Sequence, residues 1–269
     1  MLGNLMWRNL RQLPRYRGLI QTLVARELKA RYRGSALGFV WSFVNPLMLL
    51  IVYSVIFTTI MKNTSEETKP YPLFFFCGIL PWTWFQASLT EAAGSLISGG
   101  NLIRKVLFPA EVLPIVTVFT NLVHFLLGLP ILIIFLLAYR HYPTPLHVVL
   151  FPVIVLVQLV FSIGLGLALA ALSVHFRDIR DILANVLQLW FFSTPIIYFW
   201  KQPEIYKYHW LMRWNPMAQL AAGYQEALFF GDGFGAWKGI IAVGALSVVV
   251  FLLGYWLFDR LRDSFAEAV

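Results

Sequence analysis

Charged residues are scarce in this chain of 269 residues: they make up 13% of it, against about 25% in a soluble globular domain. Apolar residues make up 59%, and the mean hydropathy is +0.71. A soluble domain of this size cannot hide such an excess, because its surface must stay polar. The same excess excludes an intrinsically disordered chain. The composition therefore indicates a protein embedded in a lipid bilayer.

Cysteine and the sequence signatures of enzymes are also nearly absent. The single cysteine, Cys77, excludes a disulfide framework and a cysteine-based zinc site. No G-x-x-x-x-G-K-[ST] loop is present to hold ATP, and neither H-E-x-x-H nor G-x-S-x-G occurs. No chain of carboxylates runs through the apolar stretches, which argues against proton or sodium coupling. We therefore expect no catalytic residue, no metal site and no cofactor, and a membrane-embedded transferase is a less favoured alternative.

Six apolar stretches are each long enough to cross a membrane as a helix, which takes about 20 residues. They cover residues 36–60, 73–97, 112–139, 146–173, 182–200 and 238–258. None shows the alternation of β-barrel strands. The predicted fold class is all-α: a polytopic membrane protein with six transmembrane helices.

The basic residues predict the orientation. With both termini in the cytoplasm, 14 Lys and Arg residues fall on the inside and 7 on the outside, as the positive-inside rule requires. We expect a cytoplasmic N-terminal segment at 1–35, a transmembrane domain at 36–260 and a cytoplasmic tail at 261–269.

Residues 17–33 read RGLIQTLVARELKARYR and predict a basic amphipathic helix at the membrane interface. Ile20, Val24, Leu28 and Tyr32 recur every four residues, and the basic residues fall largely elsewhere on the helix. The helix is either a topology anchor or a cuff that also contacts a cytoplasmic partner.

Residues 98–110, SGGNLIRKVLFPA, form an apolar bump in an expected cytoplasmic loop. Gly99 and Gly100 interrupt the second stretch, and Pro109 ends the segment. A loop exposes such residues only when something covers them. Two readings stay open: a helix end sunk in the lipid headgroups, or a short helix that docks into a soluble partner.

Residues 199–238 form an external segment unusually rich in aromatic residues. Asn215 can cap a helix and Pro216 suits its first position, so we predict a helix that ends near Gly231. It is too short to span, which favours a re-entrant or interfacial position. The aromatic residues are either a belt at the headgroups or a ring around a pore mouth, where sugar faces could stack.

Glu91 is the acidic residue that stands clearly within an apolar stretch. Such groups are costly in a membrane and face a bundle interior or water. Glu91 therefore has either a functional role or a position that lets it reach the nearby interface.

Five segments, in this order, are similar to the membrane subunit of bacterial polysaccharide-exporting ABC transporters, the O-antigen and teichoic-acid export permeases. They are LKARYRGSALGFVWSFVNPLMLLIVYSVIF (28–57), YPLFFFCGILPWTWFQ (71–86), NLIRKVLFPAEVLPI (101–115), RDIRDILANVLQLWFFSTPIIY (177–198) and NPMAQLAAGYQEALF (215–229). The TPIIY ending departs from the SPIIY or SPVIY of many relatives.

This resemblance implies a homodimeric channel in the inner membrane, with two cytoplasmic ATPase subunits that bind Mg-ATP. The cargo implied is a glycan on undecaprenyl diphosphate, and alternatives are a teichoic acid, a capsular polymer, or a small lipid or drug. The segment at about 100–110 would be the coupling helix, residues 17–33 the interface helix, and about 200–231 the periplasmic gate.

Three sets of candidate residues follow. ATPase coupling is assigned to Asn101, Leu102, Ile103, Arg104, Lys105, Val106, Leu107 and Phe108. A glycan path should be lined by groups over which a polymer slides, and the candidates are Tyr53, Phe57, Trp82, Trp84, Phe85, Tyr198, Trp200 and Tyr224. The lipid diphosphate is assigned by charge-assisted contacts to Arg26, Lys29, Arg31 and Arg33.

Overall fold

The computed structural model describes residues 13–34, 38–60, 68–105, 108–199, 207, 209–230 and 235–265. Every regular element in these residues is helical, which confirms the all-α prediction. The elements are η1 (Leu13–Tyr16), α2 (Arg17–Tyr32), η2 (Gly38–Val40), α3 (Trp41–Ser54), η3 (Val55–Ile60), α4 (Tyr71–Ser98), α5 (Gly100–Lys105), α6 (Val112–Ala138), α7 (Pro145–His175), α8 (Ile179–Phe192), α9 (His209–Trp214), α10 (Pro216–Gln225), η6 (Glu226–Phe230), α11 (Trp237–Leu261) and η7 (Arg262–Ser264).

Within the described residues, four helices are long and apolar enough to cross a membrane: α4, α6, α7 and α11. A shorter apolar helix, α3, continues directly into the π-helix η3. The chain is thus a polytopic membrane protein, and each of these elements falls on one of the apolar stretches of the sequence.

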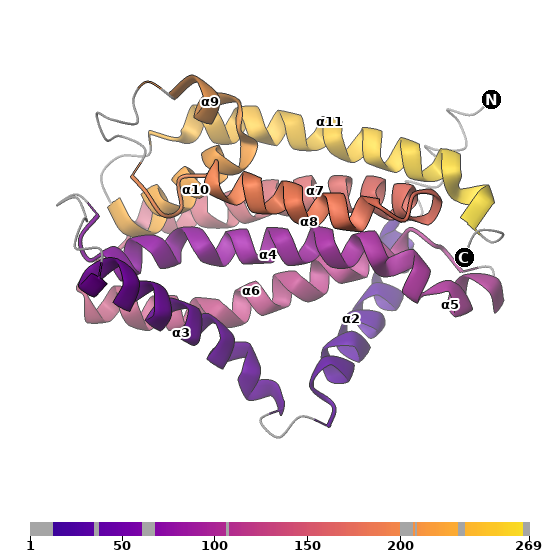
Figure 1. Ribbon diagram of the computed structural model, residues 1–269, viewed down its shortest axis with the longest axis horizontal. Helices are drawn as coiled ribbons and strands as arrows, with labels where there is room; N and C mark the ends of the chain where they lie inside the picture. Colours follow the sequence, from indigo (N-terminus) through magenta and orange to yellow (C-terminus); the bar gives the residue numbers. More distant parts are fainter. Residues whose placement is uncertain are drawn as a thin grey trace.

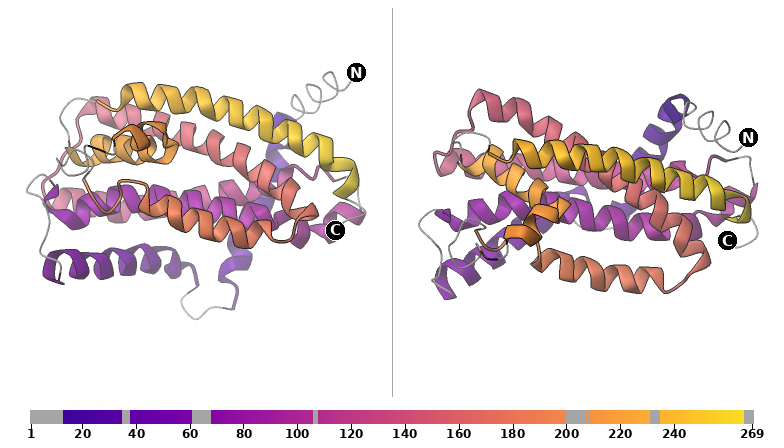
Figure 2. Two further views of the ribbon diagram at one scale, coloured as in Figure 1. Left: turned by 45° about the horizontal axis from the view of Figure 1, so that its top comes forward. Right: turned by 90° about the horizontal axis from the view of Figure 1, so that it is seen from above.

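The long helices lie side by side along the long axis of the molecule, with α4 in the middle (Figures 1 and 2). In the most apolar part of α4, 78% of the residues are buried, against 28% in each of the other three long helices. Helix α4 is therefore the core of the bundle, and α3, α6, α7, α8 and α10 pack around it. We call the two ends of the bundle the α5 end (right in Figure 1) and the α10 end (left in Figure 1).

Glycines bring α7 and α11 into close contact. A Cβ on Gly164 of α7 would lie 2.6 Å from the Cα of Phe251, and a Cβ on Gly254 of α11 would overlap the carbonyl oxygen of Gly164. Small residues at such crossings let membrane helices pack backbone to backbone, where apolar burial alone gives little driving force. This contact fixes α11 on the outside of α7.

The shorter elements match the sequence in part. Helix α2 begins at Arg17 and ends at Tyr32, as its pattern predicts. Helix α10 begins after Asn215, whose side chain accepts hydrogen bonds from two backbone N–H groups, so the predicted cap is confirmed. The last turn differs: residues 226–230 are a π-helix, in which Glu226 accepts a hydrogen bond from the backbone N–H of Ala236 at 2.7 Å.

Candidate functional site

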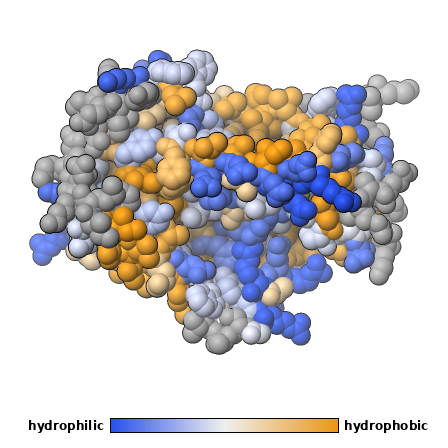
Figure 3. All heavy atoms as spheres, viewed as in Figure 1, coloured by the Kyte–Doolittle hydropathy of each residue, from blue (hydrophilic) through white to orange (hydrophobic). Residues whose placement is uncertain are grey.

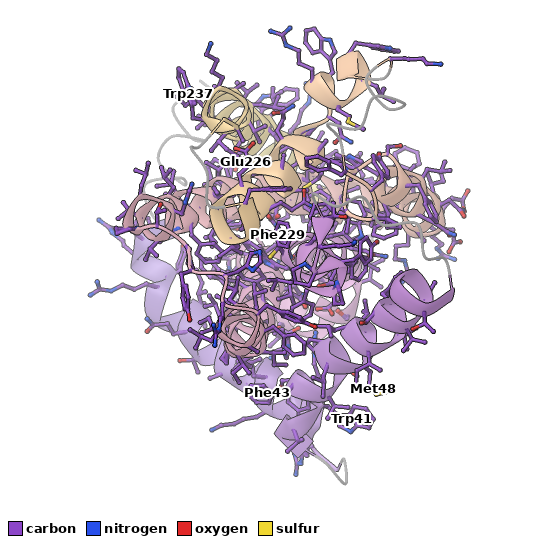
Figure 4. All side chains as sticks on the ribbon, turned by 90° about the vertical axis from the view of Figure 1, so that its left-hand side faces the viewer. Trp41, Phe43, Met48, Glu226, Phe229 and Trp237 are labelled. Atoms are coloured by element: carbon purple, nitrogen blue, oxygen red, sulfur yellow. The ribbon has the colours of Figure 1, made fainter. Side chains whose placement is uncertain are left out.

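A cleft of about 400 Å³ opens between α2, α3, α4 and α6. Its aromatic lining comes from Tyr32, Trp41, Trp84, His124 and Phe125. Figure 4 shows Trp41 and Met48 extending from one side of α3 and Phe43 from the opposite side. Trp41 is 39% exposed, so its ring is accessible at the edge of the cleft.

The cation of the cleft, Arg31, is held in a closed set of hydrogen bonds. Its Nη2 donates to Oε2 of Glu91 at 2.7 Å, and its Nη1 donates to Oδ1 of Asn121 at 3.4 Å. The amide of the buried Asn121 donates to the same Glu91 oxygen at 2.8 Å. The structure thus joins Arg31 and Glu91, two sequence candidates that stand 60 residues apart.

A second polar set links α2, α3 and α6 on the cleft wall. The Ser42 hydroxyl donates to the Tyr32 oxygen at 2.8 Å, and that oxygen lies 3.1 Å from Nδ1 of His124. The rings of Tyr32 and His124 meet edge to face. These bonds tie the end of α2 to the start of α3 and give the wall several hydrogen-bonding groups.

The basic residues of α2 divide between two faces. Arg31 shares the inward face with Ile20, Leu23 and Glu27, at helical spacing. The other three candidates are exposed and lie on the opposite face by the same spacing: Arg26, Lys29 and Arg33. The four residues therefore do not form one cationic patch.

Glu27 is the second carboxylate beside Arg31. Burial raises the pKa of Glu27, and the nearby Glu91 carboxylate raises it further. Arg31, a hydrogen bond from Thr120 at 3.5 Å and Arg26 act in the opposite direction. Two acids thus surround one guanidinium, so this part of the cleft carries no excess of positive charge.

A polar stripe on α4 was missed by the sequence reasoning. Gln86, Thr90 and Ser98 are exposed on the helix that is otherwise the most buried. Thr83, Gln86, Thr90 and Ser98 are separated by three, four and eight residues, a spacing that places them on one face of the helix, and Glu91 lies next to Thr90. That spacing within an apolar stretch was the signal that could have found them. Figure 3 shows hydrophilic side chains gathered along α8 and over the recess between α3 and α2.

The proposed glycan-path residues occupy two kinds of position. Tyr53, which stacks on Phe75 at 4.4 Å between ring centroids, and Tyr198 are half-buried. The remaining described candidates are packed between helices, each at most 2% exposed: Trp82, Trp84, Phe85 and Tyr224. Trp200 lies outside the described residues, as does the side chain of Phe57. Trp84 also lines the cleft, whereas the rings of Trp82, Phe85 and Tyr224 could meet a polymer only when the helices around α4 separate.

The aromatic segment at the α10 end also divides. Phe199 and Phe229 are buried and pack edge to face on Phe74. Trp210, Trp214 and Trp237 are at least 50% exposed, as an aromatic belt would be. One part of the segment is therefore core and the other part is surface.

The predicted coupling segment forms α5 and is anchored on two sides. Ile103 packs against a buried cluster at the α5 end that includes Tyr255, Phe258 and Phe265. Phe108 packs against Leu23 and its neighbours on α6. Asn101 is exposed and Leu102 is half-buried. Val106 and Leu107 lie outside the described residues, as do the side chains of Arg104 and Lys105.

Comparison with known proteins places the chain among transport proteins. Residues 18–229 match the family described as ABC-2 type transporter. The chain is 43% identical over 265 residues to the O-antigen export system permease protein RfbA of Myxococcus xanthus, covering 98% of this chain and 100% of the relative. It is 30% identical to the protein of the same name from Klebsiella pneumoniae, over 93% of this chain and 94% of the relative. The polysialic acid transport protein KpsM of Escherichia coli is 21% identical, over 79% and 81%.

Proposed function

The chain belongs to the ABC-2 type transporter family, and from this premise we propose that it is the membrane subunit of an exporter of O-antigen-like polysaccharide. The identity of 43% to an O-antigen export permease, along the full length of that relative, carries the proposal. Such a subunit is a transport component and not an enzyme. The family assignment made from the sequence motifs is confirmed. A capsular polymer is the second candidate cargo, because a polysialic acid transport protein is also similar at lower identity.

We propose six membrane crossings with both termini in the cytoplasm. The four long helices supply four crossings. Helix α3 with η3 supplies another, because together they run from Trp41 to Ile60. Helix α8 has 14 residues, about 21 Å, so the sixth crossing also needs the segment that follows it. In this orientation the α5 end is cytoplasmic and the inner membrane is the location.

The proposed driving force is ATP hydrolysis in a separate cytoplasmic subunit, which would bind Mg-ATP. The position of α5 supports this role. Leu102 faces partly outward, while Ile103 packs on a cluster whose buried residues include those of α7 and α11 and Phe265. A push on α5 would therefore reach the ends of two long helices through packed side chains, which transmit small displacements because they are close-packed.

The proposed conduit is formed by two copies of this chain, with the polar stripe of α4 toward the glycan. A polymer of sugars needs hydrogen-bonding groups and ring faces along its path. The exposed side chains of Gln86 and Thr90 supply hydrogen-bonding groups. Tyr53 and Tyr198 join them without rearrangement, and the buried aromatic candidates join when the bundle opens. The diphosphate of the lipid carrier is assigned to the exposed face of α2, at Arg26, Lys29 and Arg33.

The test of this function is a single substitution on α5. Leu102→Ser is introduced into the permease and coexpressed with its ATPase subunit. We expect copurification of the ATPase and its stimulation by the permease to fall, and surface polymer to decrease in cells. The matched control is Leu137→Ser, on an exposed part of α6 at the α10 end. Unchanged coupling and export in the Leu102 variant would contradict the docking role of α5, and wild-type complex that exports no polymer would contradict the function.

A further inference from the structure

The cleft between α2, α3, α4 and α6 has a lining that does not suit a strong anion. Among the described residues that line it, Arg31 is the Lys or Arg side chain, beside the imidazole of His124, and Glu91 already neutralises the guanidinium. Glu27 adds a second acid nearby. A diphosphate entering here would have to displace Glu91 and would then lie beside two carboxylates. The Coulomb interaction therefore opposes such a ligand.

The same lining suits a neutral ligand rich in hydroxyl groups. Asn45, Ser42 and Thr83 line the cleft. The amide of Asn45 can donate and accept hydrogen bonds, and the hydroxyl oxygens of Ser42 and Thr83, which donate to Tyr32 and Leu80, can accept them. The paired Arg31 and Glu91 offer donors and acceptors with little net charge. A guanidinium has five N–H donors, and the bonds to Glu91 and Asn121 engage two of its nitrogens.

Ring faces complete this set. Trp41 borders the cleft and is accessible, and Trp84 forms part of its inner wall. Tryptophan presents a large apolar face, onto which the C–H groups of a sugar ring can pack. The volume of about 400 Å³ lies within the range of about 300–1,000 Å³ typical of small-ligand sites.

We propose that this cleft binds a neutral sugar unit, with Trp41 as the platform for the ring and Asn45 and the Arg31–Glu91 pair as hydrogen-bonding partners. The inference rests on the proposed export of a glycan and assigns a separate place to its sugar. Arg26, Lys29 and Arg33 lie on the opposite face of α2. Helix α2 thus separates a cationic surface for the diphosphate from a neutral site for the sugar.

The experiment uses the complete permease–ATPase complex in lipid nanodiscs. The probe is an oligosaccharide released by mild acid from the host's own surface polymer and freed of lipid and phosphate. Saturation-transfer NMR measures the magnetisation that reaches the sugar ring protons from the protein. We expect transfer with the wild-type complex. In Trp41→Ala the signal should decrease roughly fivefold, because the loss of one aromatic contact weakens binding by about that factor. Trp41→Phe, which keeps a ring face, should restore most of the signal.

Two further variants keep the result interpretable. Asn45→Ala changes an exposed side chain, so it should reduce the signal without affecting folding. Trp256→Ala removes a tryptophan that is 47% exposed on α11, on the other side of the bundle, and should leave the signal unchanged. Equal signals in wild type, Trp41→Ala and Asn45→Ala would overturn the proposal.

Inorganic pyrophosphate decides between a sugar and an anion in the cleft. We expect it to leave the sugar signal unchanged. The proposal is overturned if pyrophosphate abolishes that signal and does so more strongly in Glu91→Gln, where Arg31 is released from its partner. A wild-type complex that exports polymer in cells but shows no oligosaccharide signal would end this inference and leave the proposed function standing. A complex that binds the oligosaccharide but exports nothing would do the reverse.

Discussion

The side-chain oxygen of Asn215 accepts a hydrogen bond from the indole N–H of Trp190 at 2.7 Å while it caps α10. The same oxygen accepts from the backbone N–H groups of Met217 and Ala218, and the amide donates to the carbonyl oxygen of Ser193 at 3.0 Å. One side chain thus joins the end of α8 to the beginning of α10.

Asn215→Ala should lower the free energy of unfolding by about 1–3 kcal/mol, because it removes a helix cap and leaves the Trp190 N–H without its acceptor. Thermal unfolding of the purified protein in detergent measures the change. Asn215→Asp keeps an acceptor oxygen and should cost less. Asn185→Ala, an exposed asparagine on α8, is the control; an equal loss there would refute the joining role of Asn215.

This cap was predictable from the sequence because it depends on neighbours in the chain. The pair Asn215–Pro216 is a local signal, as are the long apolar stretches that became α4, α6, α7 and α11. The hydrogen bond to Trp190 was not predictable, since it joins residues 25 positions apart through the packing of two helices. Local chemistry sets where elements begin, and packing sets what they contact.

The pairing of Arg31 with Glu91 in the cleft was likewise not predictable from the sequence. The sequence singled out Arg31 and Glu91 separately, one as a ligand for diphosphate and one as a costly acid in an apolar stretch. Their pairing follows from how α2 crosses α4 and α6, which no local pattern specifies. The sequence pattern grouped Arg31 with Arg26 and Lys29, and only the contact with Glu91 shows that Arg31 lies on the inward face.

The contact of α7 and α11 predicts a large difference between two glycines of α11. Gly254→Ala should destabilise the protein by about 1–3 kcal/mol, because the new methyl group overlaps the backbone at Gly164. In Gly244→Ala the new Cβ would lie 3.6 Å from a methyl group of Val157, an ordinary contact, and stability should change little. Melting temperatures and the yield of monodisperse protein check both variants. Equal values for the two would show that the backbones are not in close contact.

Glu27 should make stability depend on pH in a defined direction. Its pKa is raised by burial and by Glu91 above the ordinary value of 4.5, so folded protein holds this proton to higher pH than unfolded protein does. The stabilisation is present below pH 4.5 and is lost as pH rises through the folded pKa. Glu27→Gln cannot ionise and should therefore melt at a higher temperature than wild type above that pKa.

The pH series for Glu27→Gln is run by thermal unfolding beside Asp178→Asn, an exposed carboxylate outside the cleft. The difference between wild type and Glu27→Gln should close as pH falls toward 4.5, where both carry a neutral group. A difference that is constant with pH would mean that neither burial nor Glu91 raises the pKa of Glu27 in the folded protein.

Glu111 and Arg262 connect the segment after α5 to the end of α11. Glu111 is buried at 3% exposure, and its Oε2 lies 3.9 Å from Nη1 of the half-exposed Arg262. Removing one partner leaves a buried charge uncompensated, which costs more than the pair itself contributes. Arg262→Ala should therefore lower stability by about 1 kcal/mol, a value reduced by the exposure of the arginine.

The double variant separates charge from packing at this position. Glu111→Gln removes the buried charge, so combining it with Arg262→Ala should recover most of the lost melting temperature. Arg180→Ala, an exposed arginine on α8, is the control and should be close to neutral. If the double variant is no more stable than Arg262→Ala, the loss comes from the packing of the arginine stem and not from the unpaired carboxylate of Glu111.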